Sequence, residues 1–244
     1  MHRFYIPSAN WNPESLVLTG DEAHHCTQVV RCRVGEKVVA FNGEGTEATT
    51  EITEAEPGGV TLKTISVATS TPLRARITLA QAIPKGKNMD LIIQKATELG
   101  AAEIVPIISE RTIVRLEPDE AAKKQEKWQR VALEACKQCG QNFLPTVAAP
   151  ITIDDFFAQK PSADLPLVAS LQPGAISIKE ILAESGNNRP TSALMLVGPE
   201  GDYTPAEINA AKAFGCRPVT LGPIVLRTET AAIFTLSVLA YELM

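Results

Sequence analysis

Two short apolar runs near the end of the chain each break at a glycine–proline pair and are followed by charged side chains. The first run ends in Gly198-Pro199-Glu200-Gly201, and the second contains Gly222-Pro223 followed by Arg227 and Glu229. A buried strand that ends in a tight turn has this pattern. Glycine lets a ligand approach the backbone closely, and proline fixes the turn. The two turns are therefore predicted to hold a ligand beside carboxylate and guanidinium groups.

The charges around the first turn discriminate between ligand classes. No lysine or arginine lies between Leu194 and Tyr203, whereas Glu200 and Asp202 do, so a phosphate group would be repelled. Neither turn matches the phosphate-binding patterns G-x-G-x-x-G or G-x-x-x-x-G-K-[ST]. A neutral or cationic ligand fits better, and S-adenosylmethionine, an adenosine that bears a sulfonium and an amino group, is one. The alternative is a pair of ordinary strand-to-helix turns.

Other patterns carry weaker signals of chemistry. Arg111 follows the end of a predicted strand, a usual place for ligand contacts in α/β sheets. The pair Cys136-x-x-Cys139 has the spacing of a metal or redox motif, but a structural zinc ion needs four ligands and the chain has no second pair. The hydrolase and metalloprotease patterns G-x-S-x-G and H-E-x-x-H are absent. No metal site is therefore predicted.

Composition describes an ordinary globular protein. The chain has 244 residues, of which 45% are hydrophobic and 21% charged, which is enough for one large or two small domains. No apolar run approaches the roughly 20 residues of a membrane span, and the N-terminus lacks the pattern of a secretory signal. An odd count of five cysteines suits a reducing compartment. We expect a cytoplasmic protein that does not bind membranes.

The distribution of charge favours RNA binding more than the total charge does. The net charge is −5, which by itself speaks mildly against nucleic acid. Two local basic spots differ from this average: Arg31 with Arg33, and a stretch from Arg74 to Lys95 that also holds Arg76, Lys85 and Lys87 against one acidic residue, Asp90. The alternative is that these side chains are merely solvated.

The pattern of apolar residues divides the chain near residue 70. Residues 1–70 are predicted to form short strands separated by glycine turns, with one helix at about 21–30, which is typical of a small barrel. From residue 73, apolar runs at 77–83, 104–108, 165–171, 194–197 and 219–221 alternate with helical stretches. That alternation predicts an α/β domain with a mostly parallel sheet at 73–244.

Four helices are predicted in this second part. They lie at 89–99, where Gly100 ends the helix, at 118–139, after the capping box that Thr204 and Glu207 form, and at 229–244. The last helix carries apolar side chains on all sides, so it must be buried. Because a terminal helix is hard to bury fully within one small domain, we expect it to form a homodimer interface.

Several of these motifs, taken in order, resemble one family. They are Lys85-Gly86-Lys87 with the segment 94–100, Pro106 with 109–111, the segments 134–138 and 198–201, and Leu221-Gly222 with the sequence LRTETA at 226–231. The chain resembles the ribosomal RNA small subunit methyltransferase E family, the 16S rRNA uridine N3-methyltransferases of the SPOUT class. The stretch from His24 to Gly35 also resembles the first domain of that family, so the resemblance covers nearly the whole chain.

The resemblance implies a fold, a reaction and partners. The fold is a PUA-like RNA-binding β-barrel at 1–70 and a SPOUT domain with a deep trefoil knot at 73–244. The reaction is methylation of N3 of a specific uridine in 16S rRNA of the small ribosomal subunit, with S-adenosylmethionine as cofactor. A homodimer is also implied.

The same resemblance implies roles for particular residues. Residues for the cofactor are Leu171, Val197, Gly198, Glu200, Gly201, Leu221, Gly222, Leu226, Thr228, Thr230 and Ala231. Arg227, or the partner subunit's Arg111, would stabilise the anionic uracil, and Glu229 or Glu200 would accept the proton or orient the loop. The residues expected to contact RNA are Arg3, Arg31, Arg33, Lys85, Lys87 and Lys95.

The chain departs from the family pattern at a few positions. Gln141 and Ile224 stand where arginine is usual, Asp202 replaces the second glycine of GPEGG, and Tyr203 replaces phenylalanine. Three alternative functions stay open. One is a non-catalytic RNA-binding or ribosome-assembly factor with the same fold, another is a nucleotide-binding enzyme of Rossmann type, and the third is a methyltransferase that acts on a different RNA.

Overall fold

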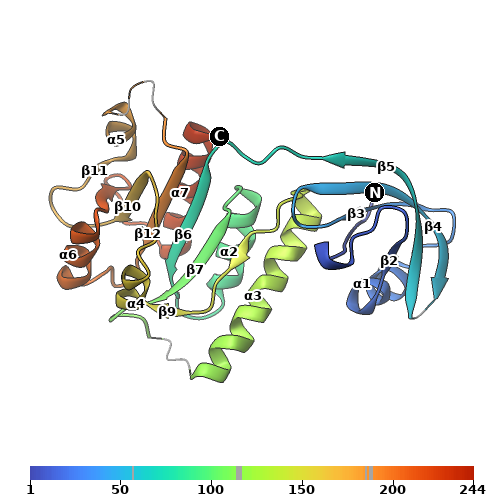
Figure 1. Cartoon of the computed structure of the whole chain (residues 1–244). Helices are drawn as coiled ribbons and strands as arrows, with labels where there is room; N and C mark the ends of the chain where they lie inside the picture. Colours follow the sequence, from blue (N-terminus) through green and yellow to red (C-terminus); the bar gives the residue numbers. More distant parts are fainter. Residues whose placement is uncertain (57, 114–116, 185, 187–188) are drawn as a thin grey trace. The chain divides into compact units, whose positions relative to one another are not determined.

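A computed structural model describes residues 1–56, 58–113, 117–184, 186 and 189–244. The chain divides into two compact units (Figure 1). The first unit contains Met1–Pro72 and Leu133–Leu144, and the second contains Leu73–Ala132 and Pro145–Met244. The sequence predicted a boundary near residue 70, and the segment Leu133–Leu144 groups with the first unit.

The first unit is built on a five-stranded sheet in the order β1-β3-β4-β5-β2. Its strands are β1 (Arg3–Tyr5), β2 (Leu16–Leu18), β3 (Lys37–Phe41), β4 (Thr46–Glu56) and β5 (Gly59–Thr69). Every pair is antiparallel except β1 with β3. Alternate residues of these strands form a buried core that includes Phe4, Leu16, Leu18 and Ile52.

The helix predicted at about 21–30 is not one regular α-helix. It begins as α1 (Gly20–His24) and continues as a π-helix, η2 (His25–Val30). Arg31 ends it in the left-handed conformation, with φ at 62°, and the Cys32 N–H donates to the carbonyl of Cys26 at 2.9 Å. Single-turn π segments are frequent at functional sites, and this one leads directly into the basic pair Arg31 and Arg33.

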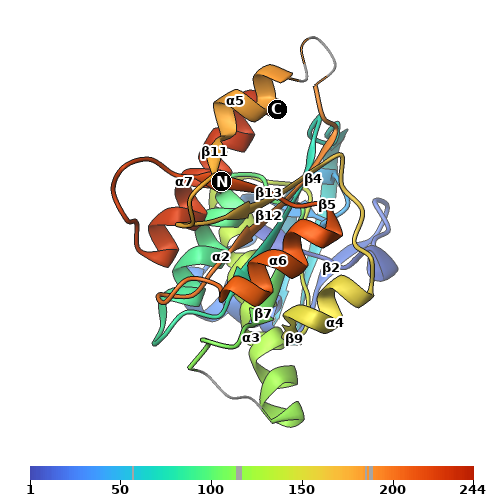
Figure 2. The same ribbon diagram turned by 90° about the vertical axis from the view of Figure 1, so that its left-hand side faces the viewer.

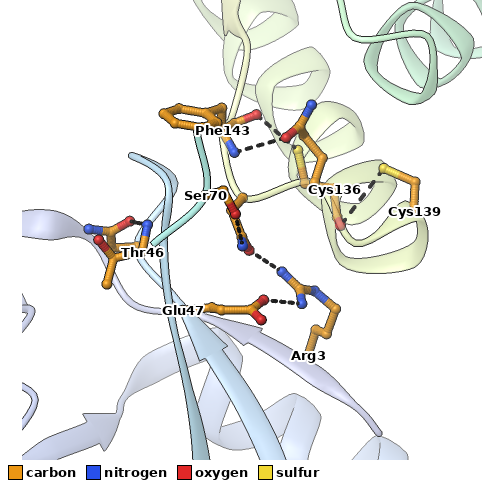
Figure 3. Close-up of polar contacts among 10 residues, drawn as sticks. Arg3, Thr46, Glu47, Ser70, Cys136, Cys139 and Phe143 are labelled. Carbon is orange, nitrogen blue, oxygen red and sulfur yellow. Dashed lines mark hydrogen bonds and ion pairs between the residues drawn. The ribbon is translucent and has the colours of Figure 1, made fainter. Parts of the chain in front are cut away.

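The end of helix α3 (Pro118–Cys139) and the segment after it are held to this first unit by polar contacts (Figure 3). The Asn142 amide donates to Ser70 Oγ at 2.8 Å and accepts from Arg3. Burial raises the pKa of the Cys136 thiol to about 12, so it stays protonated and donates to the Phe143 carbonyl at 3.8 Å. The Cys139 thiol donates to the Cys136 carbonyl at 3.9 Å, so both sulfur atoms take part in local packing.

The second unit contains an eight-stranded parallel sheet in the order β11-β13-β10-β12-β6-β7-β8, with β9 also paired to β7. The strands are β6 (Arg76–Ala82), β7 (Glu103–Ile108), β8 (Thr146–Val147), β9 (Ile151–Thr152), β10 (Leu165–Ala169), β11 (Ile176–Ser177), β12 (Ser192–Val197) and β13 (Arg217–Thr220). The predicted α/β class is confirmed. The trefoil knot stays a prediction.

Helices cover both faces of this sheet (Figure 2). The helices α4 (Ile153–Ala158) and α6 (Pro205–Phe214) share an apolar core with Ala80 and Ala82 of β6. Because side chains alternate along a strand, Gln81 points to the opposite face, where α2 (Asn88–Glu98) and α7 (Thr228–Leu243) pack together. A short helix, α5 (Ile178–Glu184), follows β11.

As the sequence predicted, the last helix is not fully buried within one chain, and the homodimer stays a prediction. Only one side of α7 is buried, against α2, β6 and β12. Phe234 is 44% exposed and Tyr241 is 87% exposed. The apolar residues that surround this helix are therefore not all covered within one chain. Among the described residues, no helix is both long and apolar enough to cross a membrane.

Candidate active site

A cavity of about 260 Å³ lies at the carboxyl ends of three neighbouring strands of the second unit. Its walls come from the loops after β10, β12 and β13, and from the start of α7. The lining residues are 169–171, 197–200, 202, 221–222, 224–228 and 231. Carboxyl ends of parallel strands meet at one edge of a sheet, which is where such folds bind ligands. The two predicted turns therefore share one cavity.

Most of the residues assigned to the cofactor from sequence line this cavity. They are Leu171, Val197, Gly198, Glu200, Leu221, Gly222, Leu226, Thr228 and Ala231. Arg227, predicted to be catalytic, also lines it, whereas Gly201, Thr230, Glu229 and Arg111 are not among the lining residues. Ala169, Ser170, Pro199 and Val225 also line the cavity; they lie in or beside the predicted loops but were not singled out, and Asp202 and Ile224 had been noted as departures from the family pattern.

Asp202 connects two walls of the cavity. Its Oδ2 accepts the N–H of Leu171 at 3.2 Å, and its Oδ1 accepts the N–H of Tyr203 at 2.8 Å. The backbone at Asp202 is left-handed, with φ at 59°. Aspartate tolerates this conformation better than most residues do. A Cβ at Gly198 would lie 3.2 Å from Asp202 Oδ1 and from the Tyr203 backbone nitrogen, so these neighbours would have to shift by a few tenths of an ångström to admit a side chain.

The segment 198–204, called the first turn below, leads into α6 through a dense set of contacts. Thr204 and Glu207 form the predicted capping box, and Glu207 also accepts the N–H of Glu110 at 2.8 Å. Tyr203 is buried and donates to the Val197 carbonyl at 3.2 Å. Burial, with the charges of Glu207 and Asp202 nearby, raises the pKa of Tyr203 above its usual value, so it stays a neutral donor.

Two residues with predicted catalytic roles make contacts that support the first turn. Glu200 Oε1 accepts the N–H of Lys85 at 2.9 Å. Arg111 Nη1 donates to the Gly201 carbonyl at 2.5 Å. Arg111 therefore holds the outside of the turn, while Glu200 ties the turn to the segment after β6 and also lines the cavity.

Residues 221–227, called the second turn below, carry Arg227 at the N-cap of α7. Arg227 is exposed and Glu229 lies in the first helical turn. Next to Arg227, the buried Thr228 hydroxyl donates to the Gly198 carbonyl at 2.7 Å and accepts from Gln81 Nε2 at 3.0 Å. Thr228 thus connects the start of α7 to the first turn.

The predicted RNA contacts fall into two groups. Arg31, Arg33, Lys85 and Lys87 are exposed, so their cationic groups can reach a phosphate, while Lys95 is paired with Glu98 at 2.8 Å. Arg3 requires a correction, because its side chain is only 14% exposed.

The Arg3 guanidinium is used inside the first unit (Figure 3). It pairs with Glu47 at 2.8 Å, donates to Asn142, and its central carbon lies 4.9 Å from the centre of the Phe41 ring. Burial alone would raise the pKa of Glu47, but hydrogen bonds from Arg3 and Asn142 and the charge of Arg3 outweigh burial and lower it. Arg3 is therefore a structural residue of this unit and not a free phosphate contact.

The composition of the cavity favours a neutral or cationic ligand. Its charged side chains are Glu200, Asp202 and Arg227, and the rest of its lining comes from apolar residues, glycine and the two hydroxyl residues Ser170 and Thr228. These side chains fit an adenosine with a sulfonium and an amino group. A phosphate would meet one guanidinium and two carboxylates, so it would be repelled more than attracted. Among the described residues, no group of three or more histidine, cysteine, aspartate or glutamate side chains could hold a metal ion.

Comparison with known proteins identifies the family. Residues 71–240 match the model of an RNA methyltransferase domain, and residues 18–65 match that of an RNA methyltransferase PUA domain. The ribosomal RNA small subunit methyltransferase E of Bacillus subtilis is 31% identical over 249 residues, which cover 99% of this chain and 97% of the relative. The chain belongs to the ribosomal RNA small subunit methyltransferase E family. The family and the PUA-like first unit that the sequence predicted are confirmed.

Solved structures of similar proteins agree with this assignment. The family member from Neisseria gonorrhoeae, bound to S-adenosyl methionine, is 32% identical with a TM-score of 0.87, and the match covers 99% of this chain and 97% of that one. A protein from Legionella pneumophila in complex with the cofactor SAM is 34% identical with a TM-score of 0.88, over 98% and 96% of the two chains. The cofactor bound in both relatives is the one that the sequence predicted for this chain.

Proposed function

We propose that this protein transfers the methyl group of S-adenosylmethionine to N3 of a specific uridine in 16S rRNA of the small ribosomal subunit. One observation carries the proposal: the two Gly-Pro turns and the loop after β10 enclose a single cavity whose charges suit a cationic cofactor. Family membership and the cofactor bound in two similar structures support it.

The chemistry requires a proton to leave and a methyl group to arrive at the same nitrogen. Uracil N3 carries a proton and is a poor nucleophile until that proton is removed. When bound, S-adenosylmethionine supplies a methyl group on a positively charged sulfur, and that sulfur keeps the electron pair of the broken carbon–sulfur bond. The protein must therefore accept the N3 proton, stabilise the anionic uracil edge and align the two reactants.

The geometry supports a division of these roles among the predicted residues. Arg227 lines the cavity at the N-cap of α7, where the helix dipole adds positive potential to its guanidinium. We assign stabilisation of the uracil anion to Arg227, because Arg111 is bonded to Gly201 of its own chain. Of the two proposed proton acceptors, Glu200 lines the cavity and Glu229 does not, so Glu200 is the favoured base.

Exposed surfaces support the proposed substrate and the proposed oligomer. Arg31 and Arg33 on the first unit, and Lys85 and Lys87 on the second, are assigned to phosphate contacts. The target base would be unstacked to reach the cavity. A second copy of the chain is assigned to the uncovered side of α7, where Phe234 and Tyr241 are exposed.

Nucleoside mass spectrometry tests the reaction directly. Unmodified small ribosomal subunits are incubated with S-adenosylmethionine and either wild type, Arg227→Ala, or Arg130→Ala, an exposed arginine on α3 outside the cavity lining. Wild type and Arg130→Ala are expected to form 3-methyluridine, and Arg227→Ala to lose at least about 100-fold in rate, as when an oxyanion donor is removed. Cofactor binding without any 3-methyluridine in ribosomal RNA would contradict the assigned substrate, and absence of cofactor binding would indicate a non-catalytic RNA-binding protein.

A further inference from the structure

Asp202 makes the only hydrogen bond, within the described residues, between the loop after β10 and the first turn. We infer that Asp202 is a positioning residue that fixes the shape of the cofactor cavity before the cofactor arrives. This inference rests on the proposed function, because the ligand whose binding it serves is S-adenosylmethionine. It concerns a residue that departs from the family pattern.

The loop after β10 has little other support at the cavity. The side chain of Leu171 is 65% exposed, so its packing does not hold the backbone in place. The Ser170 N–H donates to the Val219 carbonyl of β13 at 3.0 Å, and the Gln172 N–H donates to Ser170 Oγ at 3.1 Å, within the loop itself. The Leu171 N–H points to Asp202, which belongs to the wall on the other side.

The backbone and the side chain of Asp202 act together. The left-handed φ of 59° brings its carboxylate back over its own turn, where Oδ1 accepts the Tyr203 N–H and leaves Oδ2 for Leu171. Glycine would adopt the same backbone conformation at no steric cost, but it would leave both N–H groups without this acceptor. Charge-assisted hydrogen bonds of this kind are stronger than neutral ones.

A loop that is ordered before binding loses less conformational entropy when the ligand arrives. The carboxylate of Asp202 should therefore strengthen binding of any ligand that uses both walls, whether or not the ligand carries a positive charge. S-adenosylmethionine and its product S-adenosylhomocysteine differ in the charge on sulfur, so they separate this role from a direct contact between the carboxylate and the sulfonium.

Two measurements on full-length protein test the clamp. The first is hydrogen exchange of the Leu171 and Tyr203 amides by NMR in the ligand-free protein. Asp202→Gly is expected to speed exchange at both amides. Asp202→Asn keeps one acceptor oxygen and is expected to speed exchange at one of them. Asp154→Asn on α4 makes the same chemical change at an exposed site outside the cavity lining, and should alter neither amide.

The second measurement is calorimetric titration with S-adenosylmethionine and with S-adenosylhomocysteine. Asp202→Gly is expected to weaken both by about tenfold, the ratio that 1.4 kcal/mol produces, with Asp202→Asn intermediate and Asp154→Asn unchanged. Unaltered exchange at Leu171 and Tyr203 in Asp202→Gly would overturn the clamp, as would a loss confined to S-adenosylmethionine. If wild type bound neither compound, the proposed function would fail, while amide exchange in the ligand-free protein would still decide whether Asp202 holds the loop.

Discussion

The first and second turns start from the same Gly-Pro dipeptide and are supported very differently. In the first turn, Pro199, Tyr203 and Thr204 are buried, and contacts from Asp202, Arg111 and Glu207 fix the backbone. In the second turn, Ile224 is 74% exposed and Val225 is 71% exposed. Within residues 221–227, one backbone N–H is bonded to a side chain: the Gly222 N–H donates to Thr220 Oγ1 at a long distance of 3.4 Å.

The difference lies in the residues that follow each dipeptide. After Gly198-Pro199 come acidic and hydroxyl side chains that can accept backbone N–H groups at a helix start. After Gly222-Pro223 come Ile224, Val225 and Leu226, which offer no acceptors. A Gly-Pro pair therefore predicts where the chain turns, and the residues after it decide whether the turn is rigid in the free protein or needs a ligand or partner to cover it.

The largest loss of stability is expected from a change at Glu207, which supports the first turn where it leads into α6. The residue is 7% exposed, and its carboxylate accepts N–H groups from both Glu110 and Thr204 at 2.8 Å. Glu207→Ala removes both acceptors and half of the capping box, which should lower the free energy of unfolding by about 2–4 kcal/mol. Urea unfolding of the full chain measures it. Glu126→Ala, exposed in the middle of α3, is the control, and an equal loss in the two variants would contradict the support assigned to Glu207.

Five strands of the second sheet were predictable from their apolar runs, and four of them, β6, β7, β10 and β12, are mostly buried. The runs at 77–83, 104–108, 165–171, 194–197 and 219–221 correspond to β6, β7, β10, β12 and β13. The two-residue strands β8, β9 and β11 gave no such signal. Two-residue strands of this kind pair with a neighbouring strand that is already in place, and they do not depend on a local apolar pattern.

Site residues that belong to a sequence motif were predictable. Residues that reach the site only because of the order of the strands in the sheet were not. Ser170 lines the cavity because β10 lies between β12 and β13, an order that the sequence does not state. Arg3 was misassigned for the same reason. Its partners Glu47 and Asn142 are far away in sequence, and an arginine whose partners are unknown resembles a free one.

An intermediate effect is expected from Thr228, which joins the two turns. Thr228→Val keeps the shape of the side chain but removes the hydroxyl that donates to the Gly198 carbonyl and accepts from Gln81. Gln81 is fully buried, and among the described residues its Oε1 has no hydrogen-bond partner. Its Nε2 would lose one of its two acceptors. We expect a loss of about 1–2 kcal/mol in the free energy of unfolding.

Thermal unfolding with and without S-adenosylmethionine measures this loss. Thr228→Ser keeps the hydroxyl and serves as the matched control. Stabilisation by the cofactor should also fall in Thr228→Val, because the two walls are no longer tied together. If Thr228→Val and Thr228→Ser behaved alike in both measurements, the hydroxyl would have no role in joining the turns.

The smallest change in the stability of the single chain is expected from Phe234, which lies on α7, the helix that follows the second turn. Phe234 is 44% exposed, so Phe234→Ser should change the free energy of unfolding at high dilution by no more than about 0.5 kcal/mol, as is usual for surface positions. If a second copy covers this side of α7, the same change removes apolar area from the interface and weakens association. Sedimentation velocity over a concentration series measures it, with Val34→Ser, 61% exposed in the first unit, as the control. Two results would contradict a second copy on the exposed side of α7. One is a wild-type chain that remains monomeric at micromolar concentration, and the other is a Phe234→Ser chain that associates as strongly as Val34→Ser. In either case, the second turn would have to be ordered by its ligand alone.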